Sequence, residues 1–519
     1  MGSSGGKYLQ TFSQVMKNRI LFLLLLIFFI LLRFYPIWGN NFPFAYDNAK
    51  DSLAFLQMWT FKKPILLGAV TSLQGLWQGP LWYYILFPIN LLLGFRPMAS
   101  VLTVIGLGGF TLWLFWKYVG KLEALLFSIS PLVISTQQTS WSPYFTLFST
   151  AWILVILVSI KKKITNIQVT LLSLSLALIF HAEIAFGFVF VPCLLIALFV
   201  KKTKLNLKQV LIALVIFLFA LIPQGIFEVR HGFLQTKSVI GFVVNYNQVQ
   251  NQVWKNQTGV GRIVEVVKGF GENATGSMLP LREVPESVSV FVLVGLLGLM
   301  LIKFRSNKQT LEIVLPFIFG SFFLYLFLPF KSYYLIGLAP FWIYLFARSL
   351  KENWPELISP LVIIFLIICT VEMFFSRKNY ENLANTSRIL FEPKREAVEK
   401  AYEITGGKPF VSYQYVAEVY DYTYQFIYQY TSLLEKRPVP IEYSYAPGET
   451  SYMQTQKIKY PGTEKPAYTI LIVEKGDNEI FFPTWWNNQT RGKKIIDTEK
   501  INDSITVYKL ISDNENKKL

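Results

Sequence analysis

The chain has 519 residues, of which 53% are hydrophobic and only 16% are charged, and its formal net charge is +17. Soluble domains usually carry about 25% charged residues, and the apolar runs here repeatedly approach the roughly 20 residues that cross a bilayer. This composition excludes an ordinary soluble enzyme and predicts a polytopic α-helical membrane protein. Lys and Arg concentrate in short stretches between apolar runs, as cytoplasmic loops require, so the positive charge does not indicate binding to nucleic acid.

The first predicted elements are a cytoplasmic N-terminus (1–19) and a membrane helix (20–38). Lys17 and Arg19 place the start of this helix inside, because positively charged flanks stay in the cytoplasm. No small-x-small pattern follows the apolar core, so we interpret this segment as a retained helix and not as a cleaved signal peptide. It leads into a first outer loop (39–75).

The segment Leu76–Phe95 is apolar but contains Gly79, Pro80, Pro88 and Asn90. If this segment crossed the membrane fully, the basic clusters that follow would lie on the outer side. We therefore place it at the interface or as a re-entrant piece. Non-helical backbone at membrane depth needs protein or water around it.

The remaining spans complete a predicted total of about eleven helices, within a range of nine to thirteen. A 34-residue apolar run at 167–200 is too long for one span and is split at His181-Ala182-Glu183 into an exit and a return. The other predicted spans are 98–118, 121–138, 143–160, 209–227, 288–304, 311–329, 332–349 and 355–375, with a large outer loop at 228–287.

The transmembrane domain (20–377) precedes a C-terminal segment (378–519) that is rich in Asn, Lys, Tyr and Thr. We interpret this segment as a small extracytoplasmic α/β domain, because apolar and polar residues alternate in short runs. Helices are predicted at Pro393–Ile404 and Glu418–Leu434, and strands at Phe410–Tyr415, Tyr468–Glu474 and Ile505–Ile511.

Both cysteines, Cys193 and Cys369, lie in apolar runs, which argues against disulfides and thiolate metal sites.

The predicted topology gathers a set of ionisable residues on the outer side of the membrane. Charged groups in or beside a bilayer cost about 2.5–3.5 kcal/mol each and are functional candidates by default. The set comprises Asp47, Lys50, Asp51, His181, Glu183, Glu228, Arg230, His231 and Lys331. Asp47 and Asp51 would share one face of a helix, where Lys50 compensates their repulsion. For Lys50, Lys331, His181, Glu228 and Arg230, structural roles as anchors, as a buried histidine or as an ion pair remain open.

These residue types suit one reaction in particular. A carboxylate offers a general base, and a group of Lys, Arg and His side chains can hold a phosphate. Transfer of a sugar from a lipid phosphate donor needs both, because the acceptor hydroxyl must lose a proton and the leaving group is an anion.

The sequence resembles the GT-C superfamily of membrane glycosyltransferases. Within it, the resemblance is to the bacterial branch related to protein O-mannosyltransferases and the lipid A aminoarabinose transferase (glycosyltransferase family 39-like). The resemblance rests on Asp47 at the start of the first outer loop and on LWQGPLWYYIL (76–86). Asn48 after Asp47, and Gln78-Gly79-Pro80-Leu81, depart from the commoner family pattern. They resemble a sub-branch with Asp-x-x-Lys/Arg-Asp, together with SWSPYF (140–145), HAEIAFG (181–187) and PQGIFEVRHGF (223–233).

The resemblance implies an inverting transfer from a polyprenyl-phosphate-linked sugar. Asp47 would be the general base, and Asp51 would orient the acceptor or a divalent metal, which is left open. The implied donor-phosphate ligands are Lys50, Arg230, His231 and Lys331, and further candidate site residues are Gln78, His181, Glu183 and Glu228. Trp77, Trp82 and Tyr83 are candidates for stacking on the sugar or the prenyl chain, although aromatic residues at an interface are commonly belt residues.

Two other classes of protein stay as alternatives. A transporter or flippase for a lipid-linked or anionic substrate would also use charged residues and broken helices. An envelope assembly protein would act through its C-terminal domain, and it would be favoured if that domain held the only concave site.

Overall fold

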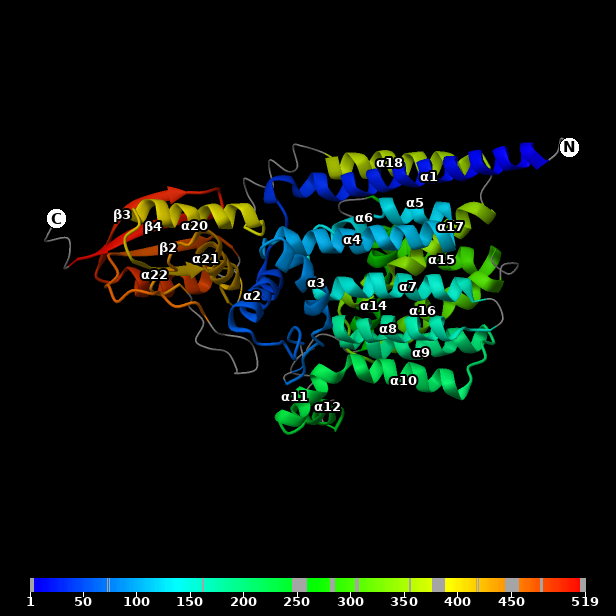
Figure 1. Ribbon diagram of the computed structural model, residues 1–519, viewed down its shortest axis with the longest axis horizontal. Coiled ribbons are helices and arrows are strands. Elements are labelled where there is room, and N and C mark those ends of the chain that lie inside the picture. Colours follow the sequence, from blue (N-terminus) through cyan, green and yellow to red (C-terminus); the bar gives the residue numbers. More distant parts are fainter. Residues whose placement is uncertain are drawn as a thin grey trace. The chain divides into compact units, whose positions relative to one another are not determined.

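The computed structural model is mainly helical and divides into two compact units, each built from separate stretches of the chain (Figure 1). The helical unit comprises Met1–Tyr35, Gly68–Trp82 and Leu102–Phe375, and the mixed unit comprises Pro36–Leu67, Tyr83–Val101 and Ser376–Leu519. The structure describes residues 4–513 except 72, 74, 161–162, 245–258, 281–284, 304–307, 354–355, 376–387, 417, 419, 444–456 and 477–478. Parts of two predicted basic clusters (Lys161–Lys163 and Lys303–Lys308) and of the predicted outer loop 228–287 therefore lie outside the described residues.

The helical unit is a layered bundle in which α7, α8 and α10 are successive neighbours and α1 lies along α18 (Figure 1). Its helices are α1 Ser4–Phe34, α4 Met98–Leu114, α5 Lys121–Ile129, α6 Pro131–Thr136, α7 Phe145–Ser159, α8 Asn166–Ala182, α9 Ile184–Val200, α10 Leu207–Ala220, α11 Ile222–Arg230, α12 Leu234–Val244, α14 Gly259–Met278, α15 Glu286–Lys303, α16 Lys308–Tyr325, α17 Ala339–Asn353 and α18 Ile358–Phe375.

Three apolar runs are interrupted, each at a local signal in the sequence. Glu183 separates α8 from α9 in an extended conformation, so the predicted division of 167–200 is confirmed. Residues 121–138 break at Ser130. Its hydroxyl oxygen accepts the Val133 N–H and caps α6, which begins at Pro131. Residues 209–227 bend by 57° between α10 and α11, where Pro223 lies in the first turn of the second helix. Proline ends or bends a helix because it lacks the N–H donor.

Length and hydropathy indicate a membrane protein. Among the described residues, four helices can cross a bilayer by these criteria, and the bent pair α10–α11 would make a fifth. They are Ser13–Asn40, Met98–Val119, Ser142–Ser159 and Ile358–Phe375. Helices α8 and α9 are apolar but have 17 residues each, slightly below the usual span. The predicted number of about eleven spans thus stays a prediction.

A buried carboxylate ties two helices of this unit together. The side chain of Glu123, in the first turn of α5, is 0% exposed. Lys351 of α17 reaches it with its Nζ atom at 2.8 Å, and the Nε atom of Arg348 lies at 3.4 Å. A charge buried this deeply requires such partners, and the pair joins helices that are more than two hundred residues apart in the chain.

The mixed unit combines the first loop with the C-terminal domain. Its elements are α2 Tyr46–Phe61, α3 Leu81–Leu92 (whose first two residues belong to the helical unit), α20 Phe391–Thr405, α21 Tyr422–Glu435, α22 Phe482–Thr490, β1 Phe410–Tyr415, β2 Tyr468–Glu474, β3 Lys493–Lys500 and β4 Ile505–Ser512. The sheet has the order β1-β2-β4-β3, with β1 parallel to β2 and the other pairs antiparallel. Helix α20 packs on β2 and β4, and α22 contacts β1 and β3.

A short backbone bridge joins the first loop to this domain. The Phe44 N–H donates to the Ile389 carbonyl at 2.8 Å, and the Phe391 N–H donates to the Phe42 carbonyl at 3.0 Å. The rings of Phe42 and Phe44 pack on Phe391, and Phe44 also contacts Phe426. Burial of these rings, worth roughly 1.5–3 kcal/mol each, makes residues 42–46 a part of the C-terminal domain.

Candidate functional site

Helix α2 presents the first predicted cluster. Lys50 and Asp47 are three residues apart, so they lie on one face of the helix, and the Lys50 Nζ atom is 3.7 Å from Asp47 Oδ1. The Asp47 side chain is 41% exposed, whereas Lys50 and Asp51 are buried. Asn48 Oδ1 accepts the Ala45 N–H at 3.1 Å. Asn48 therefore has a local structural role, because its side-chain amide oxygen helps to cap the start of the helix.

Asp51 is held by a tyrosine of the neighbouring helix. The Tyr83 hydroxyl, from α3, donates to Asp51 Oδ1 at 2.7 Å, and the ring packs edge-on against Phe55 of α2. A buried carboxylate needs such a donor. The two acids consequently differ: Asp47 is accessible to a substrate, whereas Asp51 is oriented by Tyr83. Stacking of Tyr83 on a sugar stays a prediction, and its hydrogen bond to Asp51 was not foreseen from the sequence.

Sequence reasoning also missed Glu418. This residue precedes α21 in the C-terminal domain, and its Oε1 atom accepts the Tyr46 N–H at 2.9 Å. Burial raises the pKa of Glu418, with a smaller contribution in the same direction from Asp47, while Lys394 and the Tyr46 N–H oppose the rise. The two partners are 372 residues apart, so no local pattern in the sequence could have linked them.

The helical unit brings a second predicted group together. Gln78 Nε2 donates to Glu183 Oε1 at 3.2 Å, and Gln78 Oε1 accepts the N–H of Ile184 at 2.8 Å. The Leu81 N–H donates to His181 Nδ1 at 3.3 Å. The segment 77–80 thus packs on the break between α8 and α9. Gly79 faces the His181 ring so closely that a Cβ atom there would clash with it.

The remaining predicted residues have varied surroundings. Glu228 accepts the backbone N–H groups of Gln235 and Thr236, both at 2.9 Å, so its carboxylate caps the start of α12. His231 stacks on Phe227 at 4.1 Å between ring centroids. Arg230 and Lys331 are exposed. Their binding to a donor phosphate stays a prediction.

Within the described part of the chain, no group of three or more His, Cys, Asp or Glu side chains could hold a metal ion. The α2 cluster itself offers an accessible carboxylate, a lysine beside it and an oriented second carboxylate.

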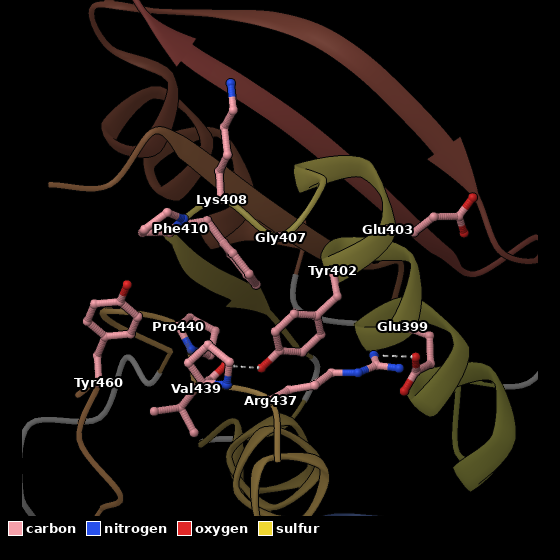
Figure 2. Close-up of a pocket in the computed structure, with 12 residues that line it drawn as sticks. Glu399, Tyr402, Glu403, Gly407, Lys408, Phe410, Arg437, Val439, Pro440 and Tyr460 are labelled. Carbon is pink, nitrogen blue, oxygen red and sulfur yellow. Dashed lines mark hydrogen bonds and ion pairs between the residues drawn. The ribbon is translucent and has the colours of Figure 1, made fainter. Parts of the chain in front are cut away.

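The C-terminal domain contains a pocket of about 470 Å³ (Figure 2). Tyr402, Phe410 and Tyr460 line it. Its polar groups already have protein partners: the Tyr402 hydroxyl donates to the Pro438 carbonyl, and Arg437 pairs with Glu399. A second, mainly apolar groove of about 350 Å³ lies in the helical unit, lined by residues of α9 and α16. The C-terminal domain therefore does not hold the only concave surface, contrary to what the assembly-protein alternative would favour.

Comparison with solved structures identifies the fold. ArnT from Cupriavidus metallidurans matches with a TM-score of 0.57 in the apo state and 0.55 in the complex with undecaprenyl phosphate. Each match has 10% sequence identity and covers 96% of this chain and 98% of the other. The chain has the fold of ArnT. The predicted architecture, a mainly helical chain with a small C-terminal sheet, is thereby confirmed, and the number of membrane helices stays a prediction.

A further match is the arabinofuranosyltransferase AftD from Mycobacteria, with a TM-score of 0.38 and 12% identity over 95% of this chain and 40% of AftD. That score is too low to support an argument. No protein-family model matches the sequence, and no curated protein matches it. At 10% identity the likeness to ArnT establishes the fold alone.

Proposed function

We propose that the protein is a membrane glycosyltransferase that moves a sugar from a polyprenyl-phosphate-linked donor to an acceptor on the outer side of the membrane. The observation that carries the proposal is the likeness to ArnT over 96% of the chain, since one ArnT structure contains bound undecaprenyl phosphate. The pair of acids on α2 supports it, because one carboxylate is accessible and the other is held by Tyr83.

In the proposed reaction Asp47 is the general base. Its carboxylate takes the proton of the acceptor hydroxyl, and the oxygen attacks the anomeric carbon of the sugar. The bond from that carbon to the phosphate oxygen breaks on the opposite face, which inverts the configuration. The electron pair leaves with the polyprenyl phosphate, so no strong acid is needed.

The other predicted residues have supporting roles in this proposal. Asp51 orients the acceptor, and positive side chains stabilise the charge that develops on the phosphate. These side chains are Lys50, Arg230, His231 and Lys331. Gln78, His181, Glu183 and Glu228 stay further candidate site residues. The identity of the sugar, hexose or pentose, is left to experiment.

The test is transfer of radiolabelled sugar from a panel of polyprenyl-phosphate-sugar donors by the purified protein in nanodiscs. Asp47→Asn should reduce turnover by about 10²–10⁴-fold, the usual contribution of a general base. Asp503→Asn is the matched control, because Asp503 also pairs with a lysine three residues away but lies on the surface of the C-terminal domain.

Two results would overturn parts of this proposal. Equal turnover in the wild type and in Asp47→Asn would remove Asp47 as the base. Absence of transfer across the whole donor panel, together with movement of lipid or solute through the protein, would favour the transporter alternative.

A further inference from the structure

The start of helix α2 is capped by a residue of a distant part of the chain. The first N–H groups of a helix have no partner within it, and Ala45 at the N-cap position has no side chain that can accept them. Glu418 fills this role by accepting the Tyr46 N–H at 2.9 Å. A carboxylate suits this place, because the helix dipole is positive at its N-terminus.

Aromatic contacts fix the same turn from the side. The ring of Tyr46 packs against Tyr422 at 5.1 Å and against Tyr420 at 6.3 Å between centroids. Both tyrosines follow Glu418 closely in the chain. The backbone bridge at Phe44 precedes the helix, so Phe44 and Tyr46, both shortly before Asp47, are held by the C-terminal domain.

The charges around Glu418 belong to a buried network. Lys394 of α20 lies 3.4 Å from Glu474 of β2, and each side chain is only 2% exposed. The hydroxyl of Tyr424 donates to Glu474 at 2.8 Å. Lys394 also attracts Glu418, whereas Glu474 and Asp47 repel it. The glutamate that caps α2 is therefore connected electrostatically to the interior of the C-terminal domain.

We propose that Glu418 is a positioning residue for Asp47: it fixes the first turn of α2 and so directs the Asp47 carboxylate toward the acceptor. The catalytic part of this inference rests on the proposed function. The C-terminal domain then has a structural role in the site, since it holds the helix that carries the base.

The experiment compares Glu418→Ala, Glu418→Gln and the control Glu399→Gln in the full-length protein in nanodiscs. Glu399 is a partly buried carboxylate of the same domain that pairs with Arg437 and is not part of the α2 cap. Hydrogen exchange by mass spectrometry over residues 42–52 reports the helix start, and sugar transfer gives kcat and the KM for the donor.

Glu418→Ala should speed exchange in the first turn of α2 roughly five- to thirty-fold, as loss of a cap does. It should lower kcat at least about tenfold with little change in KM, because a misdirected catalytic group slows the chemical step. Glu418→Gln should retain most of both properties, because its amide oxygen can accept the same N–H. Glu399→Gln should match the wild type.

Unchanged exchange in Glu418→Ala would overturn the inference, as would faster exchange with an unchanged kcat. Failure of the wild-type protein to transfer sugar would instead refute the proposed function and the catalytic part of this inference, while the exchange data would still decide whether Glu418 holds α2.

Discussion

At the scale of single residues, the two carboxylates of α2 are distinguished by their neighbours. Asp47 and Asp51 have the same chemistry, but only Asp51 receives a hydrogen bond from Tyr83. The orientation of Asp51 should therefore depend in part on the Tyr83 hydroxyl. This dependence can be tested with a substitution that removes a single oxygen atom.

Tyr83→Phe should lower stability by about 1.5–3 kcal/mol, because a hydrogen bond to a charged group is lost. Sugar transfer should also fall, since Asp51 loses a hydrogen bond that orients it. Tyr84→Phe provides the control on the same helix, where the hydroxyl donates to the neutral Ile65 carbonyl at 2.7 Å. Thermal unfolding and transfer assays of both variants measure the difference. Equal effects of the two substitutions would contradict a specific role for the Tyr83–Asp51 bond.

Glu418 gives a prediction for pH dependence. Its pKa is raised by burial, so the folded protein binds this proton more tightly than the unfolded chain does. The corresponding stability is present at low pH and is lost as the pH rises through the folded pKa. The charged groups facing Glu418 are Asp47, Lys394 and Glu474. As the pH rises from the ordinary pKa of a glutamate, about 4.3, through the raised pKa of the folded protein, the melting temperature of Glu418→Gln should fall less than that of the wild type. An identical slope in both proteins would argue against this account.

At the scale of helices and strands, most elements could be predicted because their signals are local. Strands β1 and β2 begin and end at the predicted residues, and the break at Glu183 follows from a run too long for one span. Strand β3 was missed, because its sequence KKIIDTEK lacks a clear apolar alternation and the strand is largely exposed at the sheet edge. The Ser130 break was also missed, although Ser-Pro is a helix-start signal.

The candidate site was predictable only in part, because only its local contacts leave a signal in the sequence. The helical spacing of Asp47, Lys50 and Asp51 places them together without any knowledge of the fold. Their partners Tyr83 and Glu418 come from other elements, and a single sequence contains no record of such tertiary contacts. Gln78 and Glu183 were both expected at the site, but their direct hydrogen bond appears only in the structure.

The link between α5 and α17 is an element-scale interaction that can be tested. Lys351→Met leaves the buried carboxylate of Glu123 with Arg348 alone, which should cost about 1–3 kcal/mol. The double variant Lys351→Met/Glu123→Gln should recover much of this loss, because the uncompensated charge is gone. Lys308→Met is the control, since Lys308 is 81% exposed in its pair with Glu312. Thermal unfolding in detergent measures all three, and equal losses for Lys351→Met and Lys308→Met would contradict the prediction.

At the scale of the whole molecule, the mixed unit is discontinuous in sequence. Residues 36–67 and 83–101 form one compact body with the C-terminal segment. A domain built in this way cannot be removed without loss to the parts that remain. The C-terminal domain should therefore not behave as an independent appendage.

A chain that ends after Phe375 should transfer no sugar, and its α2 should become sensitive to trypsin at Lys50, because its partners in the mixed unit are missing. A chain that ends after Asp513 retains every described element and should keep its activity. Limited proteolysis and transfer assays compare the two chains. Activity in the shorter chain would show that the first loop needs no support from the C-terminal domain.

The separation of 372 residues between Tyr46 and Glu418 has a consequence for biosynthesis. The ribosome completes Asp47 early, but the residue that caps its helix is made only after the whole helical unit. During that interval the nascent chain has its membrane helices and no assembled site. On the proposed function, a chain in the membrane that lacks the C-terminal domain cannot consume the lipid-linked donor. Sugar transfer therefore begins only after this domain has been synthesised.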